Sequence, residues 1–303
     1  MSYVFIKVIL TYIMDINLGV IFAFVAMFSW GIGDFLIQKT VRKVGDVEAL
    51  AYIGIIGGIL LLPFVILEFN LLFSLANVLV LVLLGIVTFI AALFNFEALK
   101  KGKLSVVEIM LEIELPITVV LGFIFFKEKI SFLQFFIILL IFLGILLIAL
   151  EKTSFKNKFF VFEKGVLFAL IAALGMGLIN FFTAFSSREV SPFMAVWFPW
   201  VLFTTLCIFY LIKNKRFNKL FLDFKKFKIL IIFMGVFDTL AWLSYASAVK
   251  TSNLAVTTAI TESYPAIALF LGLFINKERI DWHQYLGAAI AIVCSFLLGF
   301  IVS

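Results

Sequence analysis

The sequence predicts an all-α integral membrane protein of ten transmembrane helices, arranged as two inverted five-helix repeats. Three observations predict this class: the composition, ten long apolar stretches, and a set of motifs that recurs along the chain. Hydrophobic residues make up 65% of the 303 residues and charged residues 14%, against roughly 45–50% and about 25% in soluble proteins. A folded sphere of this size has too little interior for so many apolar side chains, so lipid must solvate most of them. This excludes a soluble enzyme, a nucleic-acid-binding protein and a disordered chain.

The ten apolar stretches are each about 20 residues long, which suits helices that cross a hydrocarbon core of ~30 Å. A lone strand would leave its backbone unpaired in lipid, and the stretches lack the alternation of a membrane β-barrel, so helices are expected. The expected spans are 18–38, 49–68, 76–98, 104–126, 131–150, 163–185, 193–212, 228–249, 254–276 and 282–302.

The expected organisation is an N-terminal extension over 1–16, a first repeat over 17–152 and a second repeat over 160–303. The first 13 residues are apolar but lack a small-residue cleavage site, so we do not expect a signal peptide. Two alternatives stay open for this extension. It is either a short interfacial segment, or it precedes a true start at Met14.

The Lys and Arg residues predict the orientation in the membrane. Connections after the odd-numbered spans hold 19 of the 24 Lys and Arg residues, and such residues concentrate in cytoplasmic loops. We therefore expect these connections in the cytoplasm and both termini outside, in a multi-pass protein of the cell membrane. The net charge of +6 comes from short clusters between apolar runs, so nucleic acid is not an expected partner.

An internal repeat relates the two halves of the chain. An offset of 150 places Glu112 on Glu262 and residues 127–130 on 277–280, and an offset of 146 places Gly31 and Asp34 on Gly177 and Asn180. Because five is odd, the second copy enters the membrane upside down relative to the first. Inverted repeats are typical of secondary transporters, whose solute site lies at the repeat interface near the membrane midplane.

Seven acidic residues fall inside apolar spans, not counting the first and last residue of a span, and no Lys or Arg lies deep in any span. A carboxylate at the bilayer centre costs roughly 2.5–3.5 kcal/mol on insertion scales, so it usually faces a wet cavity. Acids without an internal cation can also hold protons, which makes a proton a candidate coupling ion. These acids are Asp34, Glu97, Glu108, Glu112, Glu114, Asp238 and Glu262.

Helical spacing groups these acids with polar and aromatic side chains. Asp238, Trp242 and Tyr245 share one face of the eighth span, and offset 150 matches them to Thr88, Ala92 and Asn95. Thr258, Thr261 and Glu262 share a face of the ninth span with Pro265, which weakens the backbone ladder there. The predicted solute site comprises Trp30, Asp34, Asn95, Glu112, Asn180, Asp238, Trp242, Tyr245, Thr258, Thr261 and Glu262, with Glu112 facing Glu262 across the repeat axis.

Simpler interpretations exist for these residues. Asp34, Glu97 and Glu108 lie near span ends, where a side chain can reach water or a loop lysine. Glu114, on another side of the fourth span, is a candidate for a structural hydrogen bond between helices. The aromatic members are alternatively packing or belt residues, and Trp200 is expected in the aromatic belt near one membrane face.

No enzyme constellation is present. His283 is the only histidine, so neither a His-based zinc site nor a Ser-His-Asp triad can be built in the membrane. A phosphate-binding glycine loop is also absent from the sequence, which excludes an ATP-driven pump in this chain. Cys207 and Cys294 both lie in apolar runs and are expected as buried hydrophobes. We expect a non-enzyme with no cofactor and no metal.

The duplicated motifs resemble the EamA-type branch of the drug/metabolite transporter superfamily. The resemblance covers about residues 17–302 and rests on Ser29-Trp30-Gly31, the Ala-Leu-Lys end of the third span, the prolines of the fourth and ninth spans, and the Lys-Glu-Lys/Arg-Ile turns. It implies a ten-helix basket, alternating access, a cavity lined by spans 1, 3, 4, 6, 8 and 9, and export or exchange of small metabolites such as amino acids. Many relatives keep both termini in the cytoplasm, whereas the charge count in this chain predicts the opposite.

The expected function is secondary transport of a small polar or cationic metabolite, such as an amine or amino acid, by a monomer or homodimer in the lipid bilayer. The excess of cavity acids argues against a strongly anionic solute. A cation over an aromatic face gains roughly 0.5–2 kcal/mol, which suits the aromatic residues nearby. A non-transporting sensor or assembly protein and a passive channel are the alternatives.

Overall fold

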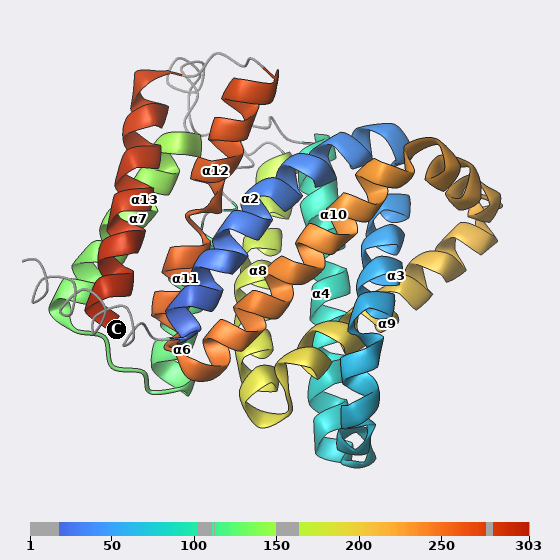
Figure 1. The fold of residues 1–303 in the computed structure, drawn as a ribbon, viewed down its shortest axis with the longest axis horizontal. Coiled ribbons are helices and arrows are strands. Elements are labelled where there is room, and N and C mark those ends of the chain that lie inside the picture. The colour runs from blue at the N-terminus through green and yellow to red at the C-terminus, as the bar shows by residue number, and fades with distance from the viewer. Residues whose placement is uncertain (1–17, 102–110, 112, 150–163, 277–280, 303) are drawn as a thin grey trace, which may run out of the picture.

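The computed structural model describes residues 18–101, 111, 113–149, 164–276 and 281–302, and these are almost entirely helical (Figure 1). In chain order the helices are α2 (Leu18–Val44), α3 (Asp46–Val65), α4 (Leu75–Lys101), α6 (Glu114–Phe125), α7 (Phe132–Ala149), α8 (Lys164–Glu189), α9 (Pro192–Lys213), α10 (Phe217–Thr251), α11 (Leu254–Thr261), α12 (Tyr264–Leu271) and α13 (Trp282–Val302). A 3₁₀ segment, η1 (Ile66–Phe73), continues α3, and a π-helical turn, η2 (Gly272–Asn276), continues α12.

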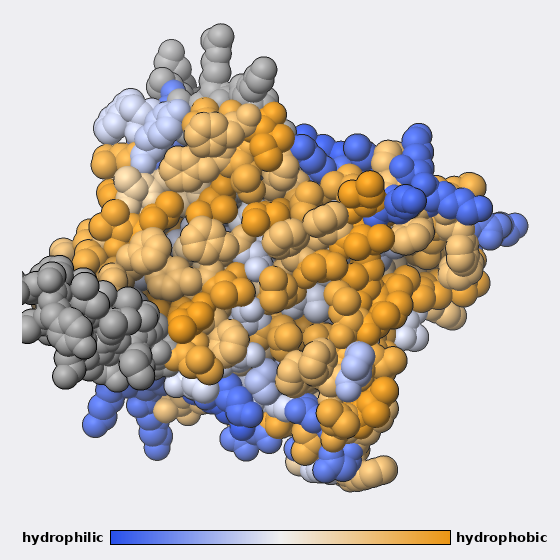
Figure 2. All heavy atoms as spheres, viewed as in Figure 1, coloured by the Kyte–Doolittle hydropathy of each residue, from blue (hydrophilic) through white to orange (hydrophobic). Residues whose placement is uncertain are grey.

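The fold is that of a multi-pass membrane protein. Within the described residues, eight helical segments are long and apolar enough to cross a membrane, and α6 and α7 are shorter apolar helices. Large apolar side chains lie on the outside, among them Ile59 (66% exposed) and Phe209 (67%). Figure 2 shows these surfaces as a wide hydrophobic band with hydrophilic residues gathered at its edges.

The predicted fold class is confirmed, but the count of ten stays a prediction. Only the second half of the predicted fourth span 104–126, helix α6, lies in the described part of the chain.

The helices pack in pairs that join the two repeats. Helix α2 lies along α10 and α4 lies along α8, so the first helix of each repeat meets the third helix of the other (Figure 1). In the same way α3 packs on α9 and α7 packs on α13. Each of these contacts between the repeats therefore fits the reciprocal pairing that an inverted duplication requires.

Two glycines at equivalent positions show that this symmetry extends to individual residue contacts. A Cβ atom on Gly31 of α2 would lie 2.5 Å from Cβ of Ile267 in α12, and one on Gly177 of α8 would lie 2.6 Å from Cγ2 of Ile117 in α6. Ile117 and Ile267 are 150 residues apart, the same offset that the sequence motifs show. Glycine is needed at both positions because only a residue without a side chain permits this approach.

Two helices are broken at equivalent places near the middle of the bundle. Helix α11 ends at Thr261 and α12 begins at Tyr264, with a turn at Glu262 and Ser263. In the first repeat, Ile113 is a turn residue and α6 begins at Glu114, which is 150 residues before Tyr264. Prolines at 116 and 265 explain both breaks, because a proline has no N–H to donate and is favoured in a first helical turn.

The bundle has two chemically different ends. One of them, called the basic end here, holds the end of α2 and the α9–α10 connection, which are joined by Lys219 Nζ donating to the Val44 carbonyl over 2.6 Å. The opposite end holds the last turns of α8 and α10 and the start of α11, and is called the latch end. The Lys and Arg count predicts that the basic end faces the cytoplasm, and this orientation stays a prediction.

Candidate functional site

A cavity of about 220 Å³ lies between the two repeats. Its walls combine acids, aromatic rings and amides from nearly every helix around it. The lining residues are Trp30, Asp34, Ile37, Leu50, Ile53, Thr88, Ala92, Asn95, Glu114, Met176, Ile179, Asn180, Trp200, Phe203, Asp238, Trp242, Glu262 and Tyr264.

The cavity lies near the middle of the bundle and reaches toward the basic end. On α8 and α10 its lining residues, 176–180 and 238–242, lie at or just past the middle of each helix. On α2 its lining runs from Trp30 to Ile37, which is the half of that helix that leads to Val44. On α3 it takes Leu50 and Ile53, which lie close to the start of the helix at the basic end.

Four carboxyl groups line this small space. Glu114, Asp238 and Glu262 are each less than one-tenth exposed, and Asp34 is half-buried. None of the cavity residues in the described part of the chain is Lys, Arg or His. Removing several negative charges from water without cationic partners is costly. The cavity is therefore built for positive charge, supplied by protons or by a cationic solute.

The cavity contains two equivalent half-sites, each built from residues of both repeats. The acid occupies a different position in each half-site. In the first half-site Tyr264 hydrogen-bonds to Asp34, and in the second Asn180 hydrogen-bonds to Glu114. Asp34 and Asn180 are related by the offset of 146, and Glu114 and Tyr264 by the offset of 150. Each half-site thus pairs one acid from the first repeat with one neutral residue from the second, but the acid is on the first helix in one half-site and on the fourth helix in the other.

The second half-site extends to a third residue. Glu114 also hydrogen-bonds to Glu262, at the break between α11 and α12. Two carboxylates offer only acceptors, so a hydrogen bond between two carboxyl groups requires one shared proton. The Asn180 amide also donates to Thr118 Oγ1 over 3.3 Å, which holds it in place.

An aromatic wall covers one side of the cavity. The Trp30 ring lies 5.0 Å from Trp242, nearly perpendicular to it, and 6.2 Å from Tyr264, while Trp200 lies 5.8 Å from Trp242. Aromatic faces attract cations through their quadrupole. Acids and ring faces within one cavity favour the same class of solute.

Two polar atoms of the lining have no hydrogen-bond partner among the described residues. They are the indole Nε1 of Trp200, a donor, and Oδ1 of Asn95, an acceptor. Buried polar groups without partners are uncommon in folded proteins. A polar solute could engage both groups in addition to the acids.

The structure brings seven of the predicted site residues together around this cavity: Trp30, Asp34, Asn95, Asn180, Asp238, Trp242 and Glu262. Three others lie outside its lining and are almost fully buried. The Tyr245 hydroxyl is 2.9 Å from Thr258 Oγ1, and Thr261 Oγ1 donates to the Thr258 carbonyl over 3.1 Å. Glu112, like Glu108 and the side chain of Glu97, lies outside the described residues, so its predicted pairing with Glu262 stays a prediction.

Sequence reasoning missed three aromatic members of the cavity, which are Trp200, Phe203 and Tyr264. Trp200 was expected in the aromatic belt, and this expectation is wrong because the side chain is 4% exposed and lines the cavity. Tyr264 was not singled out, although offset 150 matches it to Glu114. Helical counting from Thr258 to Pro265 assumed one continuous helix, and the break at Glu262 rotates everything that follows it.

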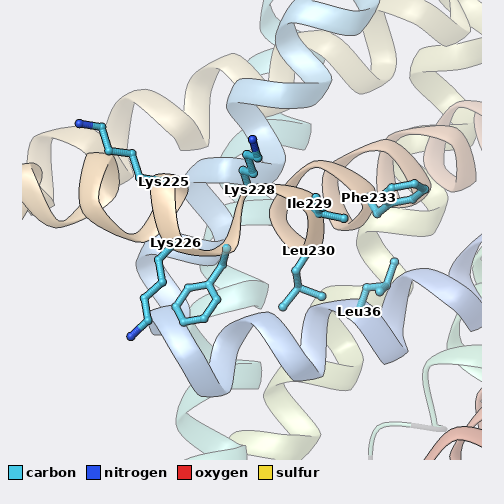
Figure 3. Close-up of a pocket in the computed structure, with 8 residues that line it drawn as sticks. Leu36, Lys225, Lys226, Lys228, Ile229, Leu230 and Phe233 are labelled. Carbon is cyan, nitrogen blue, oxygen red and sulfur yellow. The ribbon is translucent and has the colours of Figure 1, made fainter.

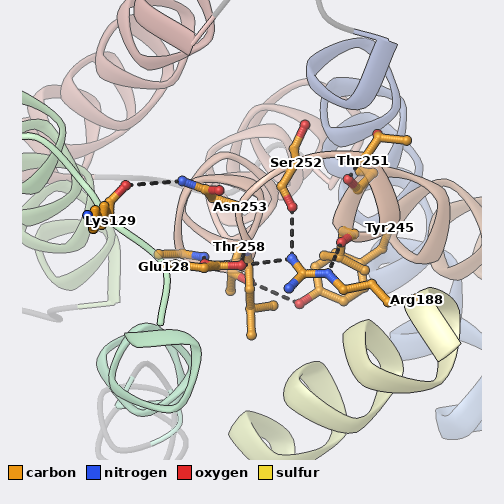
Figure 4. Close-up of polar contacts among 12 residues, drawn as sticks. Glu128, Lys129, Arg188, Tyr245, Thr251, Ser252, Asn253 and Thr258 are labelled. Atoms are coloured by element: carbon orange, nitrogen blue, oxygen red, sulfur yellow. Dashed lines mark hydrogen bonds and ion pairs between the residues drawn. The ribbon is translucent and has the colours of Figure 1, made fainter. Parts of the chain in front are cut away.

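At the latch end a polar network joins the two repeats, and we call it the latch (Figure 4). Its members are Glu128, Arg188, Val249, Ser252 and Leu254. Arg188 forms an ion pair with Glu128 at 2.8 Å and donates to the carbonyls of Val249 and Ser252 at 2.8 and 2.9 Å. Glu128 also accepts from the Leu254 N–H over 2.8 Å and thereby caps α11. Charge-assisted hydrogen bonds of this kind are stronger than neutral ones, so the latch ties the two repeats together at this end.

Comparison with known proteins identifies the family. A model of the EamA-like transporter family matches the chain twice, over residues 17–150 and 163–300. A solved structure described as "Crystal structure of protein" is similar with a TM-score of 0.75 at 14% identity, covering 94% of this chain and 97% of the other, which supports the fold. No curated protein matches the chain. The two family matches follow the two repeats whose helices interlock around the acidic cavity, and the chain belongs to the EamA-like transporter family, a family of membrane transporters in the drug/metabolite transporter superfamily.

Proposed function

We propose that this transporter carries a small solute with a positively charged amine, exchanges it for a proton, and does so by alternating access. The observation that carries the proposal is the cavity of about 220 Å³ with four acids, an aromatic wall and no cationic side chain among its lining residues in the described part of the chain. A volume of that size suits a molecule with few heavy atoms. An amine or a small amino acid meets these conditions, whereas a phosphorylated or strongly acidic solute does not.

Asp34 and Asp238 are the residues proposed to hold the amine. They lie on α2 and α10, which pack along each other. A Cβ atom on Gly33, the neighbour of Asp34 in the chain, would lie 3.7 Å from the backbone nitrogen of Asp238. Two carboxylates on adjacent helices can share one ammonium group, which carries three donors. Trp30 and Trp242 would then cover the apolar part of the solute.

Glu114 and Glu262 are the residues proposed to handle the proton. Their mutual hydrogen bond needs one proton, and both side chains are more than nine-tenths buried. When an ammonium group enters the cavity, its charge would replace the charge of the shared proton. One cation then enters as one proton leaves, which is the exchange that a secondary transporter requires.

The latch and the cavity position together support alternating access. The cavity reaches Leu50 and Ile53 near the start of α3 at the basic end, while the latch joins the two repeats at the other end. Solute would enter from the basic end and leave after the latch opens. Because the Lys and Arg count predicts a cytoplasmic basic end, efflux is the proposed direction.

Flux measurements on purified protein in liposomes test the proposal. We expect a wild-type protein to accumulate radiolabelled monoamines or neutral amino acids against a gradient when a proton gradient is applied, and to leave dicarboxylates outside. Asp238→Asn should lower this uptake about 10- to 100-fold, the range expected for losing a charge-assisted hydrogen bond. Glu189→Gln is the matched control, because it removes an exposed acid at the latch end.

Two results would overturn the proposal. Flux that a proton gradient cannot drive uphill would indicate a passive channel. No flux of any amine or amino acid, by protein that remains folded and monodisperse, would indicate a sensor or assembly role.

A further inference from the structure

The start of α10 differs from the rest of that helix in its composition and is separated from it by a kink. The helix is 35 residues long, but Phe227 interrupts it with φ −125° and ψ 25°. Residues 217–226, before this kink, lie at the basic end and combine lysines with exposed apolar side chains, such as Phe221 (61% exposed) and Leu222 (66%). A helical segment with this composition is typical of the membrane–water interface.

This interfacial segment is fixed to the bundle. Arg216 and Lys219 both bind the fully buried carboxylate of Glu48, at 2.6 and 3.3 Å. The Tyr52 hydroxyl donates to the Leu220 carbonyl over 2.5 Å. These contacts tie the segment to the start of α3, so its lysines occupy defined positions.

A pocket of about 440 Å³ lies at the kink (Figure 3). Three lysines contribute to its rim, Lys225, Lys226 and Lys228, and Figure 3 shows their side chains extending in different directions from the helix. Its remaining wall is apolar and includes Leu36 of α2 and the outward-facing Ile229 and Phe233, which are 67% and 52% exposed. The pocket therefore joins a positively charged rim to a surface that faces hydrocarbon.

Positive charge at this pocket is not neutralised within the described residues. The ammonium groups of Lys43 and Lys226 lie 5.0 and 5.2 Å from the centre of the same Phe227 ring, so they are at most about 10 Å apart. The acid of this segment, Asp223, pairs with Lys219 at 3.8 Å. Among the residues that the structure describes, Lys43 and the three pocket lysines form no ion pair. Like charges gathered in this way favour an anion between them.

We propose that this pocket binds the headgroup of an anionic phospholipid, with its phosphate among Lys225, Lys226 and Lys228 and an acyl chain along Ile229 and Phe233. The exposed apolar wall favours a lipid over a free phosphate, because a free anion would gain nothing from it. Basic residues at a membrane surface attract anionic lipids electrostatically. The site is separate from the solute cavity and does not depend on the proposed substrate.

Lipid-dependent thermal stability of the purified full-length protein tests this proposal. Detergent-solubilised protein is titrated with phosphatidylglycerol, with phosphatidylcholine, and with free glycerol phosphate. We expect phosphatidylglycerol to raise the melting temperature at concentrations at least about tenfold lower than phosphatidylcholine. The triple variant K225Q/K226Q/K228Q should lose most of this difference. Its three lysines are exposed, and its melting temperature in phosphatidylcholine alone reports whether it folds.

A matched double variant separates a specific site from general surface charge. K213Q/K215Q removes two exposed lysines of the same connection that do not line the pocket, and it should keep the phosphatidylglycerol preference. The proposal is overturned if the triple variant keeps the preference, if both variants lose it equally, or if the two lipids stabilise the wild type equally. Stabilisation by free glycerol phosphate at the same concentration would also overturn it, since the site would then bind phosphate and not lipid.

Discussion

The two half-sites of the cavity occupy equivalent places and carry different chemistry. Asp34 with Tyr264 and Asn180 with Glu114 join the same two helices of opposite repeats. The surrounding backbone is closely matched, since Gly31 and Gly177 approach the fourth helices at nearly the same distance. The symmetry of the fold is therefore retained where backbones touch and lost among the side chains that line the cavity.

This difference suggests a division of labour. The first half-site has one acid whose partner is a phenol, and it adjoins Asp238. The second half-site has an acid that also contacts Glu262. A symmetric site would bind a cation equally in two orientations, whereas under the proposed function this one offers a cation position on one side and a shared proton on the other.

The largest expected effect is a contrast between the two half-sites. Asp34→Asn should lower amine transport about 10- to 100-fold in every assay, because it removes a charge from the cation position. Glu114→Gln should abolish proton-driven uptake but leave solute-for-solute exchange close to wild type, since the cation position is intact. Proteoliposome uptake and counterflow, measured side by side, check both. Equal losses in both assays for both variants would show that the half-sites are equivalent.

The next largest effect is expected at the latch end of the bundle, where the latch can be weakened by substitution. Arg188→Ala removes one ion pair and two carbonyl contacts, which should favour the state open at the latch end by about 1.5–3 kcal/mol. In a background with Cys207 and Cys294 replaced by Ser, labelling of Thr258→Cys by a polar thiol reagent should accelerate at least several-fold. Lys250→Ala, an exposed cation at the same end, is the control. An unchanged labelling rate in Arg188→Ala would contradict a gating role.

The smallest effect tests the retained part of the symmetry. Gly31→Ala and Gly177→Ala should destabilise the protein by similar amounts, about 1–3 kcal/mol each, because both new Cβ atoms meet an isoleucine within 2.6 Å. Gly33→Ala, whose Cβ has its nearest neighbour at 3.7 Å, should be close to neutral. Thermal melting in one detergent compares the three. A large effect in only one of the first two variants would mean that the repeats are less alike than their backbones indicate.

Composition and spacing predicted the helical class, the two repeats and most of the cavity acids. These features follow from local rules, since apolar runs define spans and residue offsets define equivalent positions. The breaks before Glu114 and Tyr264 do not follow from such local rules, because a proline weakens a helix but does not determine how far the next segment rotates. The partners of Glu114 and the inward position of Trp200 depend on that rotation and on packing between distant helices, so periodicity alone could not provide them.

The reciprocal pairing of α2 with α10 and of α4 with α8 has a consequence for biosynthesis. When only the N-terminal half has been synthesised, α2 and α4 are in the bilayer before their packing partners α10 and α8 have been translated. The face of α2 that includes Gly31 has no helix to pack against until α10 and α12 have been synthesised. Maturation of this carrier must therefore wait for the last third of the polypeptide, and a truncated chain would leave its interlocking surfaces available to other membrane proteins or to quality control.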